Sequence, residues 1–204
     1  MKNKLPMTAM ILAGGKSSRM GQDKALLKFG ETALLEHLAA LIKPIFSETL
    51  VIVDDKEKLK DLRLTPAKVY EDLLKEKGPL AGIYTGLVYS RNQMSCVFTC
   101  DMPFIDEPLI RQLAHFWEED YDVVCLEDPG GKDQPFPGIY ARSARHVMSF
   151  LLNRGEGSMR RFLEVASVKP LILKEERIEV LTNMNTIQDY YQVLRQKNEQ
   201  TFSS

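Results

Sequence analysis

The sequence predicts an α/β protein with a mostly parallel β-sheet between two layers of helices, a three-layer αβα sandwich. Two observations lead to this fold class. Short apolar runs rich in β-branched residues alternate with longer segments of helical periodicity along almost the whole chain. This alternation of strands and helices is typical of parallel strands joined by helical crossovers. Glycine or acidic residues follow most of the expected strands and mark where they end. The 204 residues fit a single domain, 1–204, and no repeat or linker divides them.

The expected elements follow in order from these patterns. Strands are expected at 10–13, 50–53, 67–70, 95–99, 122–126 and 168–173, and an extended segment at 135–141. Helices are expected at 34–46, 80–91, 108–117, 144–152, 158–165 and 186–197, with a short helix or turn at 56–62. Ser158 and Thr186 are the expected N-caps of the last two helices.

The composition excludes several classes of protein. A formal net charge of −1 argues against a broad nucleic-acid-binding surface. No apolar run approaches the roughly 18 residues that span a bilayer, and no signal-length apolar region follows the N-terminal lysines, so we expect no membrane contact and a cytoplasmic location. The cysteines lack metal-ligand spacing and the histidines share no motif, so we expect buried, reduced thiols and no His-based catalysis. These residues are Cys96, Cys100 and Cys125, and His37, His115 and His146.

The most distinctive segment is the run from Leu12 to Lys24, LAGGKSSRMGQDK. Gly14 and Gly15 let the backbone turn sharply after the first strand and bring N–H groups close to a ligand, while Arg19 and Lys24 add two positive charges. Donors and cations in this position are suited to a polyphosphate. The spacing is neither that of a Walker loop nor Gly-x-Gly-x-x-Gly. For the glycine pair alone, a simple tight turn remains the alternative.

Three carboxylates follow expected strands at the same edge of the predicted sheet: Asp54, Asp72 and Asp101. Ligands of open α/β sheets bind outside the carboxyl ends of the strands. Asp101 precedes Met102-Pro103, and the proline keeps Met102 extended and fixes the carboxylate at the edge. Carboxylates and substrate phosphates are the usual ligands of Mg²⁺, and the resemblance of Cys100-Asp101-Met102-Pro103 to the metal-binding segment of the family described below implies that Asp101 is a Mg²⁺ ligand. The alternatives are a turn cap for Asp101 and a solvated loop acid for Asp72.

Four segments resemble signature segments of the molybdenum cofactor guanylyltransferases, which are Rossmann-like nucleotidyltransferases. They are the opening loop, Asp72 with Gly78-Pro79-Leu80, Cys100-Asp101-Met102-Pro103, and Asn183-Met184-Asn185-Thr186. The resemblance implies transfer of GMP from GTP to the molybdenum-pterin cofactor (molybdopterin), with release of pyrophosphate. It implies a nucleotide-binding half at about 7–105, an acceptor-binding half at about 106–198, and Arg19, Lys24 and Asp101 as catalytic residues. The substrate-binding residues that it implies are Leu12, Ala13, Gly14, Gly15, Lys24, Asp54, Asp72, Gly78, Pro79, Leu80, Asp101, Asn183 and Asn185.

The chain departs from the family pattern at two positions. Asp54 stands where many relatives have Asn, and Gln134 precedes Pro135 where relatives often have His. An Asp can accept from guanine but cannot donate as Asn does. Arg160 and Arg161 match loosely and are candidates for the acceptor phosphate. The alternatives are a cytidylyltransferase that uses CTP, on the same pterin or on a sugar or alcohol phosphate, and a non-catalytic carrier of nucleotide or cofactor. Cofactor-biosynthesis proteins and recipient molybdoenzymes are the implied protein partners.

Overall fold

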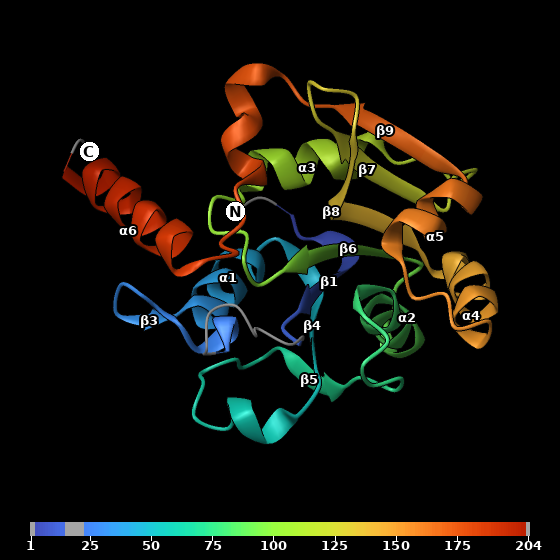
Figure 1. Ribbon diagram of the computed structural model, residues 1–204, viewed down its shortest axis with the longest axis horizontal. Coiled ribbons are helices and arrows are strands. Elements are labelled where there is room, and N and C mark those ends of the chain that lie inside the picture. Colours follow the sequence, from blue (N-terminus) through green and yellow to red (C-terminus); the bar gives the residue numbers. More distant parts are fainter. Residues whose placement is uncertain (1–2, 15–22, 203–204) are drawn as a thin grey trace.

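The computed structural model describes residues 3–14 and 23–202 of the chain (Figure 1). Its main sheet has the strand order β5-β4-β1-β6-β8-β7-β9, and β2 and β3 form a separate hairpin. The strands are β1 (Leu5–Leu12), β2 (Lys28–Phe29), β3 (Thr32–Ala33), β4 (Phe46–Val53), β5 (Lys68–Glu71), β6 (Met94–Thr99), β7 (Val123–Glu127), β8 (Asp133–Ala141) and β9 (Val168–Ile172).

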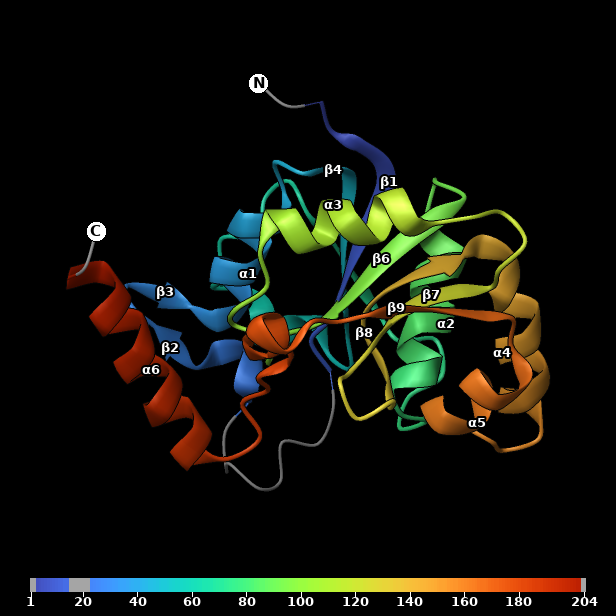
Figure 2. The same ribbon diagram turned by 90° about the horizontal axis from the view of Figure 1, so that it is seen from above.

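Helices lie on both faces of the main sheet, as the sequence predicts, and the C-terminal helix packs on the β2–β3 hairpin instead. The helices are α1 (Leu34–Ile42), α2 (Pro79–Tyr89), α3 (Glu107–Phe116), α4 (Arg145–Asn153), α5 (Met159–Val165) and α6 (Ile187–Phe202), with 3₁₀ turns η1 (Lys24–Leu26), η2 (Lys56–Leu59), η3 (Arg142–Ala144) and η4 (Glu175–Leu181). Helices α1 and α3 cover one face, and α2, α4 and α5 cover the other (Figures 1 and 2). Among the strands described in this sheet, β8 alone runs antiparallel to its neighbours. The predicted fold class is confirmed.

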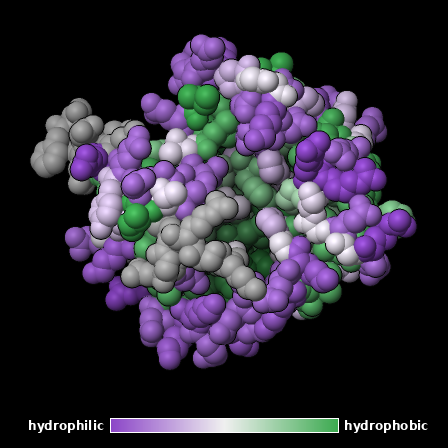
Figure 3. Space-filling model, viewed as in Figure 1, coloured by the Kyte–Doolittle hydropathy of each residue, from purple (hydrophilic) through white to green (hydrophobic). Residues whose placement is uncertain are grey.

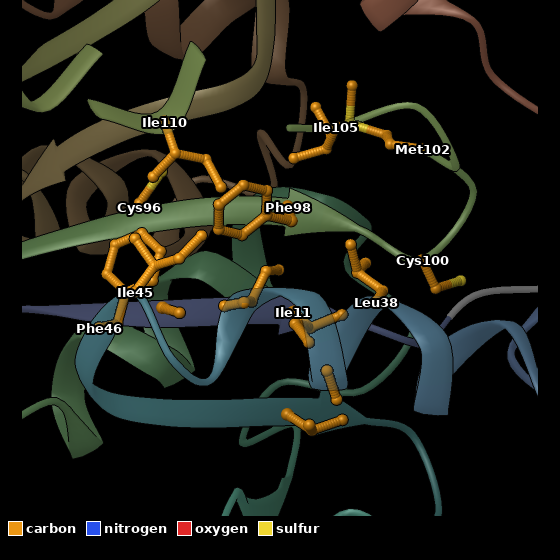
Figure 4. Close-up of a cluster of buried hydrophobic side chains, with 14 of the residues drawn as sticks. Ile11, Leu38, Ile45, Phe46, Cys96, Phe98, Cys100, Met102, Ile105 and Ile110 are labelled. Atoms are coloured by element: carbon orange, nitrogen blue, oxygen red, sulfur yellow. The ribbon is translucent and has the colours of Figure 1, made fainter. Parts of the chain in front are cut away.

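Alternate residues of the central strands supply the two apolar cores. On β1, Ile11 packs with the α1 and α3 layer, while the adjacent Met10 and Leu12 pack with α2. Figure 4 shows the first of these cores, where Ile11 and Leu38 lie close to Phe98 of β6. Because both faces of the sheet are buried, its central strands are apolar on both sides, which is why they appear in the sequence as continuous runs.

The first helix is shorter than the sequence predicts, and the expectation of a helix over 34–46 is wrong at its C-terminal end. Helix α1 ends at Ile42, and Phe46 already begins β4. Pro44 is the physical reason, since a proline has no N–H to continue the helical bonding. The chain turns there instead, with the Ile45 N–H donating to the Ile42 carbonyl at 2.9 Å.

The hairpin β2–β3 and the turn η4 are not predicted by the sequence. The two hairpin strands have two residues each, too few for a period-two pattern to show. The hairpin matters because α6 packs on it (Figure 2), through an apolar cluster of Phe29, Leu34, Met184 and Val193. Across residues 3–14 and 23–202, none of the helices combines the length and apolar character needed to cross a bilayer.

Both expected N-caps are confirmed, and the one before α6 is reciprocal. The Ser158 hydroxyl accepts from the Arg161 N–H at the start of α5. Before α6, the Thr186 hydroxyl accepts from the Asp189 N–H at 3.1 Å, and the Asp189 carboxylate accepts from the Thr186 N–H at 2.8 Å. The same carboxylate oxygen also accepts from the Asn185 N–H at 2.8 Å. Asp189 therefore fixes both the start of α6 and the segment that precedes it.

We predict that Asp189→Ala lowers the free energy of unfolding by about 1 kcal/mol near neutral pH, because two backbone N–H groups lose their acceptor. The N–H groups of Thr186 and Asn185 hold the pKa of Asp189 below its ordinary range. The stabilisation is therefore complete above the pKa of the unfolded state, about 3.9, and is lost as the pH falls through the folded-state pKa.

Urea unfolding of the wild type and the variant at several pH values checks this. The difference should stay constant from about pH 7 to pH 5 and shrink below about pH 4. Gln188→Ala, at an exposed neighbouring position in α6, is the matched control. A difference that persists unchanged at the lowest pH would contradict the role assigned to the carboxylate.

Candidate active site

One edge of the main sheet carries Gly14, at the start of the predicted phosphate loop, and all three predicted carboxylates. Gly14, Asp54, Asp72 and Asp101 follow β1, β4, β5 and β6, which are neighbours in the order β5-β4-β1-β6. Their parallel pairing is in register at this end, because Leu12 lies opposite both Ile52 and Thr99. The molecule is hollowed at the centre of the face shown in Figure 3, where hydrophobic residues lie deep and hydrophilic residues form much of the rim. Gly15 and Arg19 lie outside the described residues.

Asp101 is held at this edge by its two buried neighbours. Cys100 and Met102 both pack into the core beneath α1 and α3 (Figure 4). The Cys100 N–H donates to the Leu12 carbonyl at 3.2 Å, so the turn after β6 stays paired with the end of β1. With both flanking side chains anchored in the core, the Asp101 side chain remains 17% exposed at the rim. The buried neighbours and the backbone hydrogen bond thus fix the carboxylate position.

Lys24 reaches the Asp101 carboxylate from the far end of the opening loop. Its position is set by η1, where the Asp23 carboxylate accepts from the Ala25 N–H at 3.1 Å and the Ala25 side chain is fully buried. The Lys24 Nζ donates to Asp101 Oδ2 at 2.9 Å and to Asn185 Oδ1 at 3.0 Å. A cation, a carboxylate and a carboxamide from three separate parts of the sequence therefore meet at one point.

Asn185 reaches this point because the residue before it is buried. The Met184 side chain is fully buried, and its backbone N–H donates to the Asp101 carbonyl at 3.0 Å. Asn183 and Asn185, on either side of it, are both exposed, which is the alternation expected of neighbours in an extended segment. The C-terminal segment is thus tied to the Asp101 turn by its backbone and by the Lys24 bridge.

Gly14 brings the backbone of the opening loop against Asp54. A Cβ atom at Gly14 would lie 2.8 Å from Asp54 Oδ1 and 3.1 Å from the Asp54 backbone nitrogen. A side chain at residue 14 would therefore displace the Asp54 carboxylate and press on its backbone, and glycine avoids both. Leu12 and Ala13, the other predicted loop residues described, have buried side chains and can offer a ligand only backbone groups.

Asp72 is oriented by a buried hydroxyl on α2. The Thr85 Oγ1 donates to Asp72 Oδ1 at 2.7 Å and accepts from the Leu73 N–H at 3.1 Å. The other carboxylate oxygen, Oδ2, lies on the side of Gly82, 3.9 Å from where a Cβ would be. The turn after β5 is therefore fixed against α2, with one oxygen of Asp72 already engaged.

The predicted Gly78-Pro79-Leu80 segment divides between surface and core. Gly78 and Pro79 are exposed at the N-terminal end of α2, whereas the Leu80 side chain is fully buried. Gly157, from the second half of the chain, packs directly against the Lys77 carbonyl, where any side chain would collide. The two predicted halves therefore meet at a second place, beside the start of α2.

The loosely matching residues of the second half have partners of their own. Arg160 pairs with Glu164, and Arg161 pairs with both Glu156 and Glu164. Gln134 donates from its amide to the Asp128 carboxylate at 2.8 Å. The structure thus brings none of these side chains to the Lys24, Asp101 and Asn185 cluster.

The chemistry of the edge is that of oxygen ligands and cations. All three cysteines are buried and free, and burial raises the pKa of Cys100 to about 12, so its thiol stays protonated. The part of the chain that the structure describes holds no group of three His, Cys, Asp or Glu residues able to bind a metal. Two oxygens, Asp101 Oδ2 and Asn185 Oδ1, nevertheless converge on one ammonium group. This donor set fits a hard divalent cation that takes its other ligands from a substrate.

Two residues that support the site are not predicted from the sequence. Asp189 orients Asn185 through its backbone, and the Thr-x-x-Asp spacing from Thr186 is a signal that could have revealed it. Thr85 lies in an apolar helix, where a buried hydroxyl needs a hydrogen-bond partner. That partner, Asp72, could not be identified without the topology.

Comparison with known proteins agrees with the fold and with the family resemblance of the sequence motifs. Residues 9–178 match the family model described as "MobA-like NTP transferase domain". The crystal structure of molybdopterin-guanine dinucleotide biosynthesis protein A from Archaeoglobus fulgidus superposes with a TM-score of 0.80, covering 97% of this chain and 100% of that one. At 22% identity, this likeness concerns the fold.

Two curated relatives match over most of their length. A probable molybdenum cofactor guanylyltransferase of Carboxydothermus hydrogenoformans is 37% identical, over 93% of this chain and 95% of that protein. One from Clostridium perfringens is 31% identical, over 93% of this chain and 97% of that protein. The resemblance inferred from the sequence motifs is confirmed: the chain belongs to the family of MobA-like NTP transferase domains, which are nucleotidyltransferases.

Proposed function

We propose that this protein transfers GMP from GTP to the molybdenum-pterin cofactor, forming the guanine dinucleotide cofactor and releasing pyrophosphate. The guanylyltransferase names of its relatives support this choice of substrates. The observation that carries it is the meeting of Lys24, Asp101 and Asn185 at the carboxyl edge of the sheet. There a cation and a carboxylate from the proposed nucleotide-binding half, 7–105, meet an amide from the proposed acceptor-binding half, 106–198.

The reaction needs alignment and charge neutralisation more than acid–base catalysis. A terminal phosphate oxygen of the acceptor forms a bond to the α-phosphorus of GTP, while the bond to the pyrophosphate oxygen breaks and its electron pair leaves with pyrophosphate. The acceptor phosphate is already an anion near neutral pH, so no strong base is required. The chain must bring two anions together and stabilise the leaving group, which explains a site of carboxylates and cations.

Each part of the edge has a proposed role in this reaction. Asp101 would hold Mg²⁺, which when bound would neutralise triphosphate oxygens and charge on the leaving pyrophosphate. Lys24 and Arg19 would hold the β- and γ-phosphates with backbone N–H groups of the loop. The nucleoside would contact Asp54, Asp72 and the backbone around Gly78, and the acceptor would contact Asn183 and Asn185. Arg19 remains a proposal from the sequence motif.

The setting of the reaction is proposed on the same basis. A cytoplasmic enzyme would receive the pterin from other cofactor-biosynthesis proteins and deliver the dinucleotide form to molybdoenzymes. The single domain proposed for residues 1–204 is supported by the pairing of β6 with β8, which carries one sheet across both halves.

The direct test of this function is pyrophosphate release from GTP with freshly prepared molybdopterin as acceptor. We predict turnover with GTP and Mg²⁺ and a loss in kcat on the order of 100-fold or more in Asp101→Asn. Asp120→Asn is the matched control, because Asp120 is exposed in the turn before β7, at the opposite edge of the sheet. Faster turnover with CTP would assign the protein to the cytidylyltransferases, and no turnover with any nucleotide would leave only a carrier.

We also predict that Thr85 acts on nucleotide affinity by positioning Asp72. Thr85→Val keeps the shape of the side chain but removes the hydrogen bond at 2.7 Å, so GTP should bind about fivefold more weakly, with kcat at saturation unchanged. Titration calorimetry and steady-state kinetics measure the two quantities. Thr49→Val, at another buried threonine on β4, controls for the loss of a hydroxyl. Asp72 Oδ1 also accepts from the Leu74 N–H at 3.0 Å, so an unchanged affinity in Thr85→Val would reject the positioning role of Thr85.

A further inference from the structure

The Lys24 ammonium lies at the position where a metal cation shared by Asp101 and Asn185 would lie. It is 2.9 Å from Asp101 Oδ2 and 3.0 Å from Asn185 Oδ1. Both members of the ion pair are only 17% exposed, so solvent screens their attraction less than at an open surface. The carboxylate assigned to the metal therefore already has a counter-cation of its own.

The segments that carry Lys24 and Asn185 are fixed by hydrogen bonds of their own. Asp23 caps the turn that begins at Lys24, and Asp189 holds the backbone of Asn185. The Met184 N–H ties that segment to the Asp101 carbonyl. The two oxygens that accept from the ammonium therefore belong to segments whose positions the protein itself fixes. A divalent cation that approaches Asp101 alone would have to displace a positive charge or bind beside it, and both are unfavourable.

A nucleoside triphosphate changes this balance, because it offers Lys24 a more highly charged anion. The lysine side chain is a flexible four-carbon stem with a compact charge, so the ammonium can move from the carboxylate to a phosphate oxygen without movement of η1. Once it has moved, Asp101 Oδ2 is open to the metal. The same step brings phosphate oxygens to the metal. These oxygens supply further ligands, because the described residues contain no group of three His, Cys, Asp or Glu side chains that could hold a metal by themselves.

We propose that Lys24 is an internal counter-cation that keeps the divalent cation off Asp101 until a nucleoside triphosphate binds. Metal and nucleotide then bind cooperatively, and by linkage each tightens the other by the same factor. This inference rests on the proposed function, since it assigns the triphosphate to this edge. It assigns Lys24 a role before the chemical step, in addition to its contact with the phosphates.

The test is binding of Mn²⁺ to the nucleotide-free protein, followed by electron paramagnetic resonance of free Mn²⁺. Lys24→Met removes the ammonium and keeps an unbranched side chain, so the variant should bind Mn²⁺ about tenfold more tightly than the wild type. Lys28→Met, which removes an exposed lysine from the adjacent strand β2, should bind Mn²⁺ as the wild type does. Adding Asp101→Asn to Lys24→Met should abolish the gain, which locates the metal at this carboxylate.

Lys24→Gln provides a second neutral variant, for use if Lys24→Met does not fold. An Mn²⁺ affinity equal to or weaker than that of the wild type in the folded variant would overturn the inference and leave a purely structural ion pair. The outcome is separable from that of the proposed function. Wild-type turnover of GTP with no gain in Mn²⁺ affinity would reject only the counter-cation, whereas a gain in Mn²⁺ affinity together with turnover of CTP in place of GTP would reject only the function.

Discussion

Parallel, in-register pairing of β5, β4, β1 and β6 brings the carboxyl ends of four strands to one edge, and the whole candidate site depends on this constraint. Because Leu12 is aligned with both Ile52 and Thr99, the residues that follow these strands emerge at the same level. Buried neighbours then set the direction of each functional side chain. Cys100 and Met102 do so for Asp101. The packing of these two buried side chains therefore matters to the site as much as the carboxylate that they position.

The C-terminal part of the chain reaches the site through side-chain packing and a backbone hydrogen bond. Met184 is buried with Phe29 in the small cluster between the β2–β3 hairpin and α6, while its backbone binds the Asp101 carbonyl. Packing of α6 on the hairpin therefore positions Asn185 next to Lys24. Because Lys24 donates to both Asp101 and Asn185, one side chain joins the proposed nucleotide-binding half to the proposed acceptor-binding half.

Much of this arrangement could be predicted from the sequence, for stated physical reasons. Strands buried on both faces leave continuous apolar runs, and glycine or acidic residues after them mark the ligand edge, so Gly14 and Asp101 could be assigned to this edge from the sequence alone. Contacts between residues distant in the sequence could not be predicted. The hydrogen bonds of Thr85 with Asp72 and of Lys24 with Asn185 depend on how the helices and strands pack. The strands of the β2–β3 hairpin are too short for the alternation of apolar and polar residues to show in the sequence. Helix α1 ends before Pro44, although the apolar spacing continues to Phe46.

The central claim is that this edge binds metal and nucleotide together, with Asp101 as metal ligand. Its most direct test is a crystal structure with Mn²⁺ and a non-hydrolysable GTP analogue, in which anomalous scattering locates the metal. The account predicts a peak about 2.1 Å from an Asp101 carboxylate oxygen, with the Lys24 Nζ moved onto a phosphate oxygen. A peak elsewhere on the protein, with Lys24 still paired to Asp101, would contradict it.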